Sequence, residues 1–137
     1  MNNFFRFNTS VYYEDTDSSG FVYHASYLKF AERSRSEMIK YIFPKISEII
    51  SNSNFFFVVK DLSVKYIKPL VLFDKVVIET KMKNLNKASL ELQQDIFKNN
   101  SNCCSIEVKL VWINKKDGKP KRIPSNLMAS LSQIKIV

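Results

Sequence analysis

Glycine and proline are scarce in this chain, whose 137 residues include two glycines and four prolines. Long disordered linkers are usually rich in both residues, so we expect a single folded domain over residues 1–137. No segment approaches the roughly 20 consecutive apolar residues that a membrane-spanning helix needs. The first residues also lack the apolar run and the cleavage site of a signal peptide. These absences favour a cytoplasmic protein.

Metal ligands are scarce as well. His24 is the only histidine, and the only cysteines are the neighbours Cys103 and Cys104. A zinc site needs about four suitably spaced ligands, which this set does not supply. In a strand, the two cysteine side chains would point to opposite faces and be badly placed to bond to each other. We therefore predict free thiols, no metal site and no cofactor.

Positive charge, by contrast, is in excess. Lysine and arginine number 21 against 13 acidic residues, which gives a formal charge of +8, while 45% of the residues are apolar. The apolar fraction is sufficient for a hydrophobic core, and the charge favours a negatively charged partner. Nucleic acid, an anionic lipid surface and a phosphate-bearing small molecule all meet this condition.

Alternating apolar residues predict five strands, separated by short polar segments. The alternation covers residues 5–13, 62–67, 76–82, 90–96 and 104–112. Short polar connections between successive strands are typical of an antiparallel sheet. The last four strands follow one another directly, so we expect them to belong to one sheet.

A three-four spacing of apolar residues predicts a helix between the first two strands, beginning at Ala25 and running for about four to five turns. Its apolar face would carry Tyr27, Phe30, Ala31, Ser34, Met38 and Tyr41. Ser26 or His24 could cap its start, and Pro44 should end it. Residues 45–50 could add a short helical turn. One helix of this length covers only part of a curved sheet, so we expect a second subunit to bury the remaining apolar face or edge.

Residues 13–27, Tyr-Glu-Asp-Thr-Asp-Ser-Ser-Gly-Phe-Val-Tyr-His-Ala-Ser-Tyr, join the first strand to the helix. Residues 15–20 read as a turn, because Asp and Ser bind the local backbone and Gly20 tolerates a positive φ. We interpret Asp15 as holding the turn and Glu14 as solvated. Asp17 would then lie beside the start of a helix, where unpaired N–H groups are available. A carbonyl substrate attacked by a base, or by the carboxylate itself, needs both features.

The run YYEDTDSSGFVYHASYLKFAERSRSEM resembles the hot-dog fold thioesterases of the 4-hydroxybenzoyl-CoA thioesterase-like branch. Within that branch it is most similar to the acyl-CoA thioesterases associated with the bacterial Tol-Pal system. The segment VKDLSVKYIKPL and the following Asp74 also match, so the resemblance extends over residues 5–124. It departs from many relatives at Ser18-Ser19, where they have Ala, Pro or Gly, and at Asn86-Lys87, which lacks a glycine.

The resemblance implies an α+β hot-dog fold, in which a five-stranded antiparallel sheet wraps one long central helix. It also implies active sites at a dimer interface, with dimers that often pair into tetramers. The expected substrate is an acyl-CoA, of which coenzyme A is a part, or alternatively an acyl-carrier-protein thioester. Any membrane association would be peripheral.

The same resemblance assigns the catalytic roles to Asp17 and His24. Asp17 would activate water or attack the thioester carbonyl itself, and the residues leave both routes open. The backbone N–H of His24 would polarise the carbonyl, while its imidazole could also orient water or substrate. The residues predicted to bind substrate are Tyr13, Gly20, Val22, Tyr23, Tyr27, Lys65 and Lys87. The two lysines would meet coenzyme A phosphates, as would other candidate cations at Lys68, Lys115, Lys116, Lys119, Lys121 and Arg122.

Two other classes of function remain open. A basic nucleic-acid-binding module would suit the charge of +8, but the predicted helix mixes acids with bases and has an apolar face that belongs in a core. A hot-dog dehydratase or a non-catalytic acyl-binding scaffold would keep the fold without hydrolysis. The histidine-and-acid arrangement of the dehydratases is not visible here.

Overall fold

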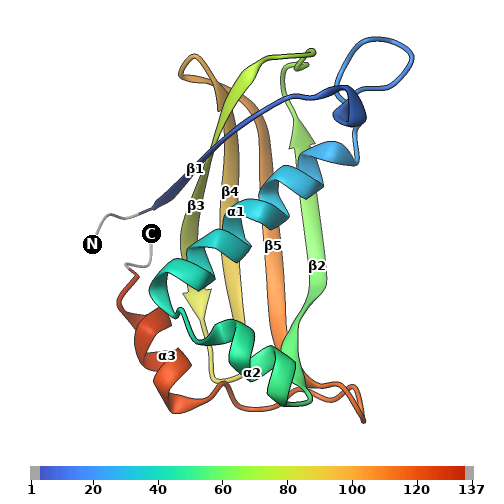
Figure 1. The fold of residues 1–137 in the computed structure, drawn as a ribbon. Helices are drawn as coiled ribbons and strands as arrows, with labels where there is room; N and C mark the ends of the chain where they lie inside the picture. The colour runs from blue at the N-terminus through green and yellow to red at the C-terminus, as the bar shows by residue number, and fades with distance from the viewer. Residues whose placement is uncertain (1–3, 135–137) are drawn as a thin grey trace.

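The computed structural model describes residues 4–134, and in it one long helix lies across a five-stranded sheet (Figure 1). The strands are β1 (Phe5–Ser10), β2 (Phe55–Tyr66), β3 (Lys75–Leu85), β4 (Ser89–Lys98) and β5 (Ser101–Asn114). The helices are α1 (Ser26–Ile42), α2 (Ile46–Asn52), α3 (Ser125–Ser132) and the short 3-10 helix η1 (Tyr13–Asp15). Among the described residues, no helix is long and apolar enough to cross a membrane.

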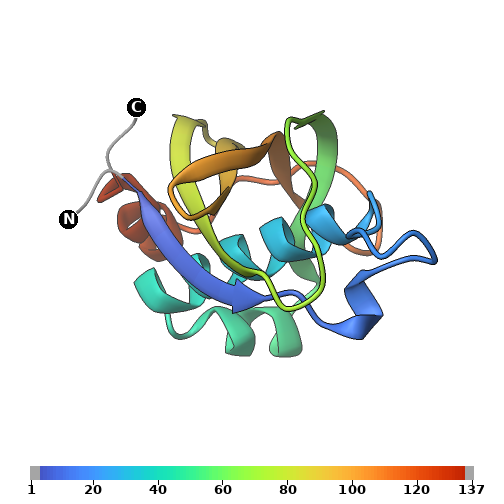
Figure 2. The same cartoon turned by 90° about the horizontal axis from the view of Figure 1, so that it is seen from above.

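The sheet has the order β1-β3-β4-β5-β2, and every neighbouring pair is antiparallel. The turn between β4 and β5 has positive φ at both Asn99 and Asn100, which suits a tight hairpin because asparagine tolerates this conformation. Figure 2 shows the sheet curling around α1. The predicted arrangement of one central helix wrapped by a five-stranded antiparallel sheet is therefore confirmed.

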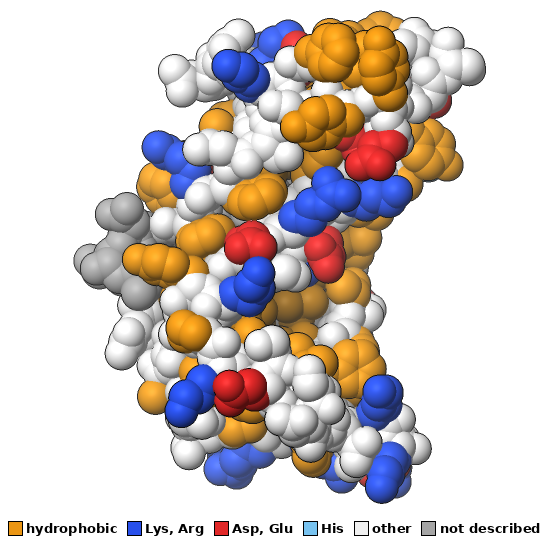
Figure 3. All heavy atoms as spheres, in the orientation of Figure 1, with side chains coloured by type: hydrophobic (Ala, Val, Ile, Leu, Met, Phe, Trp, Pro, Cys, Tyr) orange, Lys and Arg blue, Asp and Glu red, His pale blue; other side chains and the backbone are white. Residues whose placement is uncertain are grey.

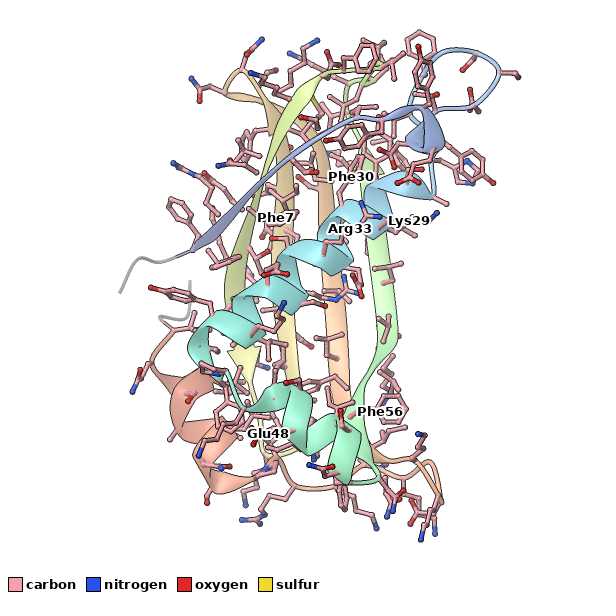
Figure 4. The ribbon with its side chains drawn as sticks, viewed as in Figure 1. Phe7, Lys29, Phe30, Arg33, Glu48 and Phe56 are labelled. Carbon is pink, nitrogen blue, oxygen red and sulfur yellow. The ribbon has the colours of Figure 1, made fainter. Side chains whose placement is uncertain are left out.

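The apolar face of α1 is buried in the curve of the sheet. Phe30, Ala31 and Met38 are almost completely inaccessible to solvent. Phe7 of β1 packs against the buried cluster that contains Phe30 of α1, and Figure 4 labels both side chains. This burial supplies most of the driving force for docking α1, at about 1.5–3 kcal/mol for each large side chain.

A buried polar network also fastens α1 to the sheet. The amide nitrogen of Gln94 on β4 donates to the Ala31 carbonyl at 2.7 Å and to the Thr80 hydroxyl oxygen at 2.8 Å. The Ser34 and Thr80 hydroxyl oxygens lie 2.9 Å apart. Gln94, Thr80 and Ser34 are fully buried, so these bonds satisfy groups that would otherwise be costly to bury.

The other end of the core lies between α2, α3 and the start of β2. Trp112 on β5 is stacked on Phe55, with ring centres 6.4 Å apart, and meets the edge of Phe57 at 4.8 Å. Leu127 and Leu131 of α3 close this end and are completely buried. Helix α3 was not predicted from the sequence, although its burial shows that it belongs to the core.

Several local predictions need correction. Tyr41 was predicted on the apolar face of α1 but is 72% exposed, because Met38, Ile39 and Phe43 form the buried face at this end of the helix. The residue preceding α1 is Ala25, and no side chain caps this end, so neither Ser26 nor His24 has that role. The first strand ends at Ser10 rather than at residue 13, and β2 begins at Phe55 rather than at residue 62.

Candidate active site

The loop from η1 to α1 is held by Asp15. Its buried carboxylate accepts a hydrogen bond from the Tyr12 N–H at 2.9 Å, and its carbonyl accepts one from the Tyr23 N–H at 2.8 Å. Gly20 has a φ of +86°, and no atom lies within 4 Å of the position that a Cβ would take. Gly20 is therefore required by backbone conformation rather than by space. Asp15 holds the turn, and Gly20 has the positive φ predicted for it.

The loop presents Asp17 to solvent. One carboxylate oxygen, Oδ1, accepts hydrogen bonds from the Ser19 N–H at 2.8 Å and from the Ser19 hydroxyl. The backbone closes the same turn, because the Asp17 carbonyl accepts the Gly20 N–H at 3.1 Å. The second oxygen, Oδ2, accepts no hydrogen bond from the described residues. Asp17 is thus fixed through one oxygen and open at the other.

The environment of Asp17 favours its ionised form. The Ser19 hydroxyl and the Ser19 N–H hold the pKa of Asp17 below its usual value, and the nearby His24 contributes in the same direction. Hydrogen bonds to a carboxylate stabilise the charged form. The side chain is therefore a carboxylate at neutral pH and can accept a proton or attack an electrophile.

His24 precedes the first turn of α1, where a helix has N–H groups without intrahelical partners. Its carbonyl accepts a hydrogen bond from the Tyr66 hydroxyl at 2.7 Å. Within residues 4–134 no acceptor is found for its own N–H. The Ser26 N–H, by contrast, is bound to the Tyr23 carbonyl at 2.8 Å. The His24 N–H is therefore available to a ligand, at the end of the helix where the dipole is positive.

The aromatic residues of the motif divide into exposed and buried ones. Tyr13 is 74% exposed, and the ring of Tyr23 lies 4.3 Å from the His24 ring. Val22 and Tyr27 are buried, and the Tyr27 hydroxyl accepts the Leu70 N–H at 3.2 Å. Tyr13 and Tyr23 are accessible to a substrate in this chain, whereas Val22 and Tyr27 support the loop from within the core.

The two lysines predicted to bind coenzyme A lie at opposite ends of the molecule. Lys65 is at the end of β2 that also carries Tyr66, close to the loop with Asp17. Lys87 lies in the turn between β3 and β4, where its carbonyl accepts the Ile123 N–H at 2.8 Å. Figure 3 shows lysine and arginine side chains at the lower end of the molecule, where Lys115 is bound through its backbone to Asn54. A single chain does not bring Lys65 and Lys87 together.

Tyr66 links β2 to the residue before α1 through its hydrogen bond to the His24 carbonyl, a contact that was not predicted from the sequence. It was recognised only as one of the alternating residues of a strand. Burial raises the pKa of the Tyr66 hydroxyl, which keeps it protonated as a donor to His24. The link between residues 24 and 66 comes from tertiary structure, and no local sequence signal indicates it.

Neither cysteine forms part of a reactive centre. Cys103 and Cys104 are free thiols, buried on β5, as predicted. Burial raises the pKa of Cys104 to about 12, so its thiol stays protonated. Within the described part of the chain, no group of three or more histidine, cysteine or acidic residues could hold a metal ion.

The chain belongs to the thioesterase-like superfamily, whose family model matches residues 11–131. It is 31% identical over 135 residues to the acyl-CoA thioesterase YbgC of Haemophilus influenzae, with 98% of this chain and 99% of that protein covered. It is 35% identical over 130 residues to the acyl-CoA thioester hydrolase YbgC of Escherichia coli O157:H7, covering 94% and 96% of the two chains. The crystal structure of a probable thioesterase from Bartonella henselae is similar with a TM-score of 0.81 and 33% identity, covering 88% of this chain and 99% of that one.

Proposed function

We propose that this protein hydrolyses acyl-CoA thioesters, with Asp17 as the catalytic carboxylate and the His24 N–H as the group that polarises the carbonyl. The proposal depends chiefly on one observation. An ionised carboxylate with a free oxygen lies in the loop that leads directly to an unpaired N–H at the start of α1. The names of the YbgC relatives support acyl-CoA as the substrate class.

In the general-base route, Asp17 takes a proton from water while the water oxygen attacks the thioester carbon. The carbonyl oxygen becomes negative and is stabilised by the His24 N–H and the helix dipole. Removal of one such donor costs about 2.7–4 kcal/mol in a well-studied protease. The carbon–sulfur bond then breaks, the sulfur leaves with the proton from Asp17, and the products are a carboxylic acid and free coenzyme A.

In the nucleophilic route, the free oxygen of Asp17 attacks the thioester carbon and expels the thiolate, which gives a mixed anhydride. Water then hydrolyses this anhydride: its oxygen and one proton go to the released acid, the other proton goes to the coenzyme A thiolate, and Asp17 is restored as a carboxylate. Both routes consume one water and need the same two groups, Asp17 and the His24 N–H. Neither route requires a cofactor beyond the substrate.

The substrate contacts that we propose follow from exposure and charge. Tyr13 and Tyr23, with the open turn at Gly20, would contact the pantetheine arm near the thioester. Val22 and Tyr27 would shape this surface from below. Lys65 would meet a coenzyme A phosphate at the same end of the chain.

A second copy of the chain would complete the site. Strand β2 lies at an edge of the sheet and exposes Val59, Leu62 and Tyr66 by 43–48%. An edge strand of 12 residues, paired on one side only and carrying exposed apolar side chains, is suited to forming an interface. Antiparallel pairing of two β2 strands about a twofold axis would bring the partner's Lys87 towards the end of the molecule that carries Asp17. Pairing of such dimers into a tetramer, and an acyl carrier protein as an alternative carrier, are extensions of this proposal.

The test is thiol release from acyl-CoA substrates by the parent protein and by Asp17→Asn. The amide keeps an oxygen for the Ser19 N–H and hydroxyl, so the loop should retain its conformation. We expect kcat to fall by about 10²–10⁴-fold, the usual contribution of a general base, with little change in KM. Equal rates for the two proteins would refute the role of Asp17. Free acid and thiol in equal amounts distinguish hydrolysis from dehydration, and an acyl-binding scaffold would release neither.

A further inference from the structure

A short turn, residues 70–74, lies between β2 and β3. The loop that carries Asp17 begins beside this turn. There the Val11 N–H donates to the Asp74 carbonyl at 2.9 Å, and the Val11 carbonyl accepts the Phe73 N–H at 2.9 Å. Val11 is completely buried. Two hydrogen bonds in opposite directions therefore fix the start of the loop on the turn.

The same turn also holds the other end of the loop. The Val22 N–H donates to the Leu70 carbonyl at 2.9 Å, and Phe21 forms an isolated antiparallel bridge with Val71. The Phe21 carbonyl accepts the Asp17 N–H at 3.1 Å. Figure 1 shows the loop before α1 and the segment that leads into β3 at the same end of the molecule. A shift of the turn would therefore reach the backbone of Asp17 directly.

Asp74 fixes the shape of the turn and ties it to the sheet. Its Oδ2 accepts the Val71 N–H at 2.8 Å, and its Oδ1 lies 2.9 Å from the ammonium nitrogen of Lys98 at the end of β4. The side chain is only 11% exposed, less than any other acid in the ion pairs found among residues 4–134. Burial raises the pKa of Asp74, but the Val71 N–H and Lys98 outweigh burial and hold this pKa below its usual value. Asp74 is therefore a carboxylate with both oxygens engaged.

The backbone of Phe73 shows how strongly the turn is constrained. Its φ is +69°, in the left-handed region that a bulky side chain rarely adopts. Such a conformation persists only where the surrounding structure fixes it, and it is frequent beside functional sites. The ring is 63% exposed and meets only the edge of the Tyr13 ring, at a centre distance of 5.7 Å. Burial of the ring therefore does not account for this conformation, whereas the hydrogen bonds of Val11 and Asp74 do.

We propose that Asp74 is a positioning residue for Asp17. Its carboxylate holds the turn 70–74 against β4, and the turn holds both ends of the loop that carries Asp17. Lys98 acts through Asp74, because Asp74 is its ion-pair partner. This inference rests on the proposed function of Asp17. A displacement of about 1 Å at a reacting centre can cost about 10²-fold in rate, so a turn that fixes the loop has a large effect without touching the substrate.

The first experiment does not depend on activity. Amide hydrogen exchange is measured for the Val11 and Val22 N–H groups, which are bonded to the turn. We expect Asp74→Ala to speed both by at least about tenfold, because the turn loses its carboxylate. Asp74→Asn keeps an oxygen for the Val71 N–H and should change exchange by less than about threefold. The Trp112 N–H on β5 reports opening of the core and should not change. Equal acceleration at all three amides, or none at Val11 and Val22, overturns the inference.

The second experiment asks whether Asp74 acts through Asp17. We expect Asp74→Ala to lower kcat for acyl-CoA hydrolysis by about 10–100-fold, with a smaller change in KM. Asp17→Asn already lacks the catalytic carboxylate, so the further change to Asp74→Ala should lower its residual rate by less than about twofold. A residue that merely stabilises the fold would cause the full loss again in this background, and that result refutes positioning.

Two further variants complete the test. Glu79→Gln breaks the ion pair with Arg6 at 3.1 Å, whose acid is 18% exposed, and this matched control should leave kcat unchanged. Lys98→Met removes only the ion pair and should lower kcat by about threefold, with no further loss when added to Asp74→Ala. Should Asp74→Ala fail to fold, the cycle with Asp17→Asn is run on Lys98→Met, and a threefold loss that persists in this background refutes the inference.

The outcomes separate this inference from the proposed function. A parent that releases no thiol from any acyl-CoA overturns the proposed function and the catalytic consequence drawn from it, while the exchange experiment still decides whether Asp74 holds the loop. An active parent whose Asp74→Ala variant keeps its full kcat overturns only the positioning role.

Discussion

Replacement of Gln94 by leucine tests whether the buried polar network fastens α1 to the sheet. Gln94 is fully buried, and its amide nitrogen donates to the Ala31 carbonyl at 2.7 Å and to the Thr80 hydroxyl at 2.8 Å. Leucine has a similar size but no polar atom. The Thr80 hydroxyl would keep its Ser34 partner at 2.9 Å, so the variant leaves no hydroxyl wholly unpaired.

The size of the effect follows from these contacts. Each lost bond is worth about 1 kcal/mol net, and the partly unsatisfied Ala31 carbonyl adds a fraction of a further about 1–3 kcal/mol. The apolar contacts of leucine offset part of the loss. We expect the free energy of unfolding to fall by about 2–3 kcal/mol. Thr80→Val removes the hydroxyl that Gln94 and Ser34 share, so the double variant should lose about 1 kcal/mol less than the sum of the single variants.

The assay is urea unfolding followed by the fluorescence of the only tryptophan, Trp112, which is buried in the core. Protein concentration is held fixed, because assembly would add to apparent stability. With a denaturant slope of about 1–3 kcal/mol per molar, the midpoint should move by about 1 M or more. A loss below about 0.5 kcal/mol, within the range of an ordinary surface substitution, or strictly additive double-variant energies would refute the idea of a network.

Three further predictions concern the site and the thiols. Ser19→Ala removes the main donor that holds the pKa of Asp17 below its usual value. In the proposed mechanism activity needs the carboxylate and is lost as pH falls through this pKa, so the acid limb of the kcat/KM profile should move to higher pH. Ser18→Ala is the control. An unmoved limb would separate Asp17 from the reaction. Tyr66→Phe removes the 2.7 Å hydrogen bond to the His24 carbonyl. It should lower kcat by about tenfold with a smaller change in KM, because a displaced His24 N–H would no longer point at the carbonyl oxygen of the substrate. The control Tyr41→Phe, at an exposed position, should have no effect. The thiols of Cys103 and Cys104 are buried, and the Cys104 pKa is raised to about 12, so a disulfide reagent should label them only as fast as the protein unfolds, and rapid labelling of the native protein would contradict their burial.

The architecture could be predicted from local periodicity because its elements are amphipathic. The three-four spacing located α1, and alternation located β3, β4 and most of β5. Elements buried on more than one side were harder to detect. The start of β2 is the unbroken aromatic run Phe55-Phe56-Phe57, in which no alternation is visible, and Trp112 packs against two of its rings. Helix α3 has only two turns, too few to establish a period.

The candidate site was predictable where its contacts are local. Asp15 bonds three residues away, Asp17 bonds two residues away, and Gly20 has the positive φ of its turn. Such short-range geometry follows from the preferences of aspartate, serine and glycine. The bond from Tyr66 to His24 spans 42 residues, and its existence depends on how β2 passes the start of α1. A pattern of hydrophobicity indicates which face a side chain takes, but not which residue it meets.

The separation of Lys65 and Lys87 shows why substrate contacts are the last feature that one sequence can supply. Both are exposed cations, and both could meet a phosphate, yet they lie at opposite ends of one chain. A twofold axis relating two chains, as in the proposed β2 pairing, would bring Lys65 of one chain towards the end of the other chain that carries Lys87. The alternating pattern of β2 would be the same with or without a partner strand. Val59 and Leu62 have the same property, since both are apolar side chains that are exposed on the β2 edge of one chain. In the proposed dimer the substrate would contact both chains, and contacts that cross the twofold axis would have no signature within either chain alone.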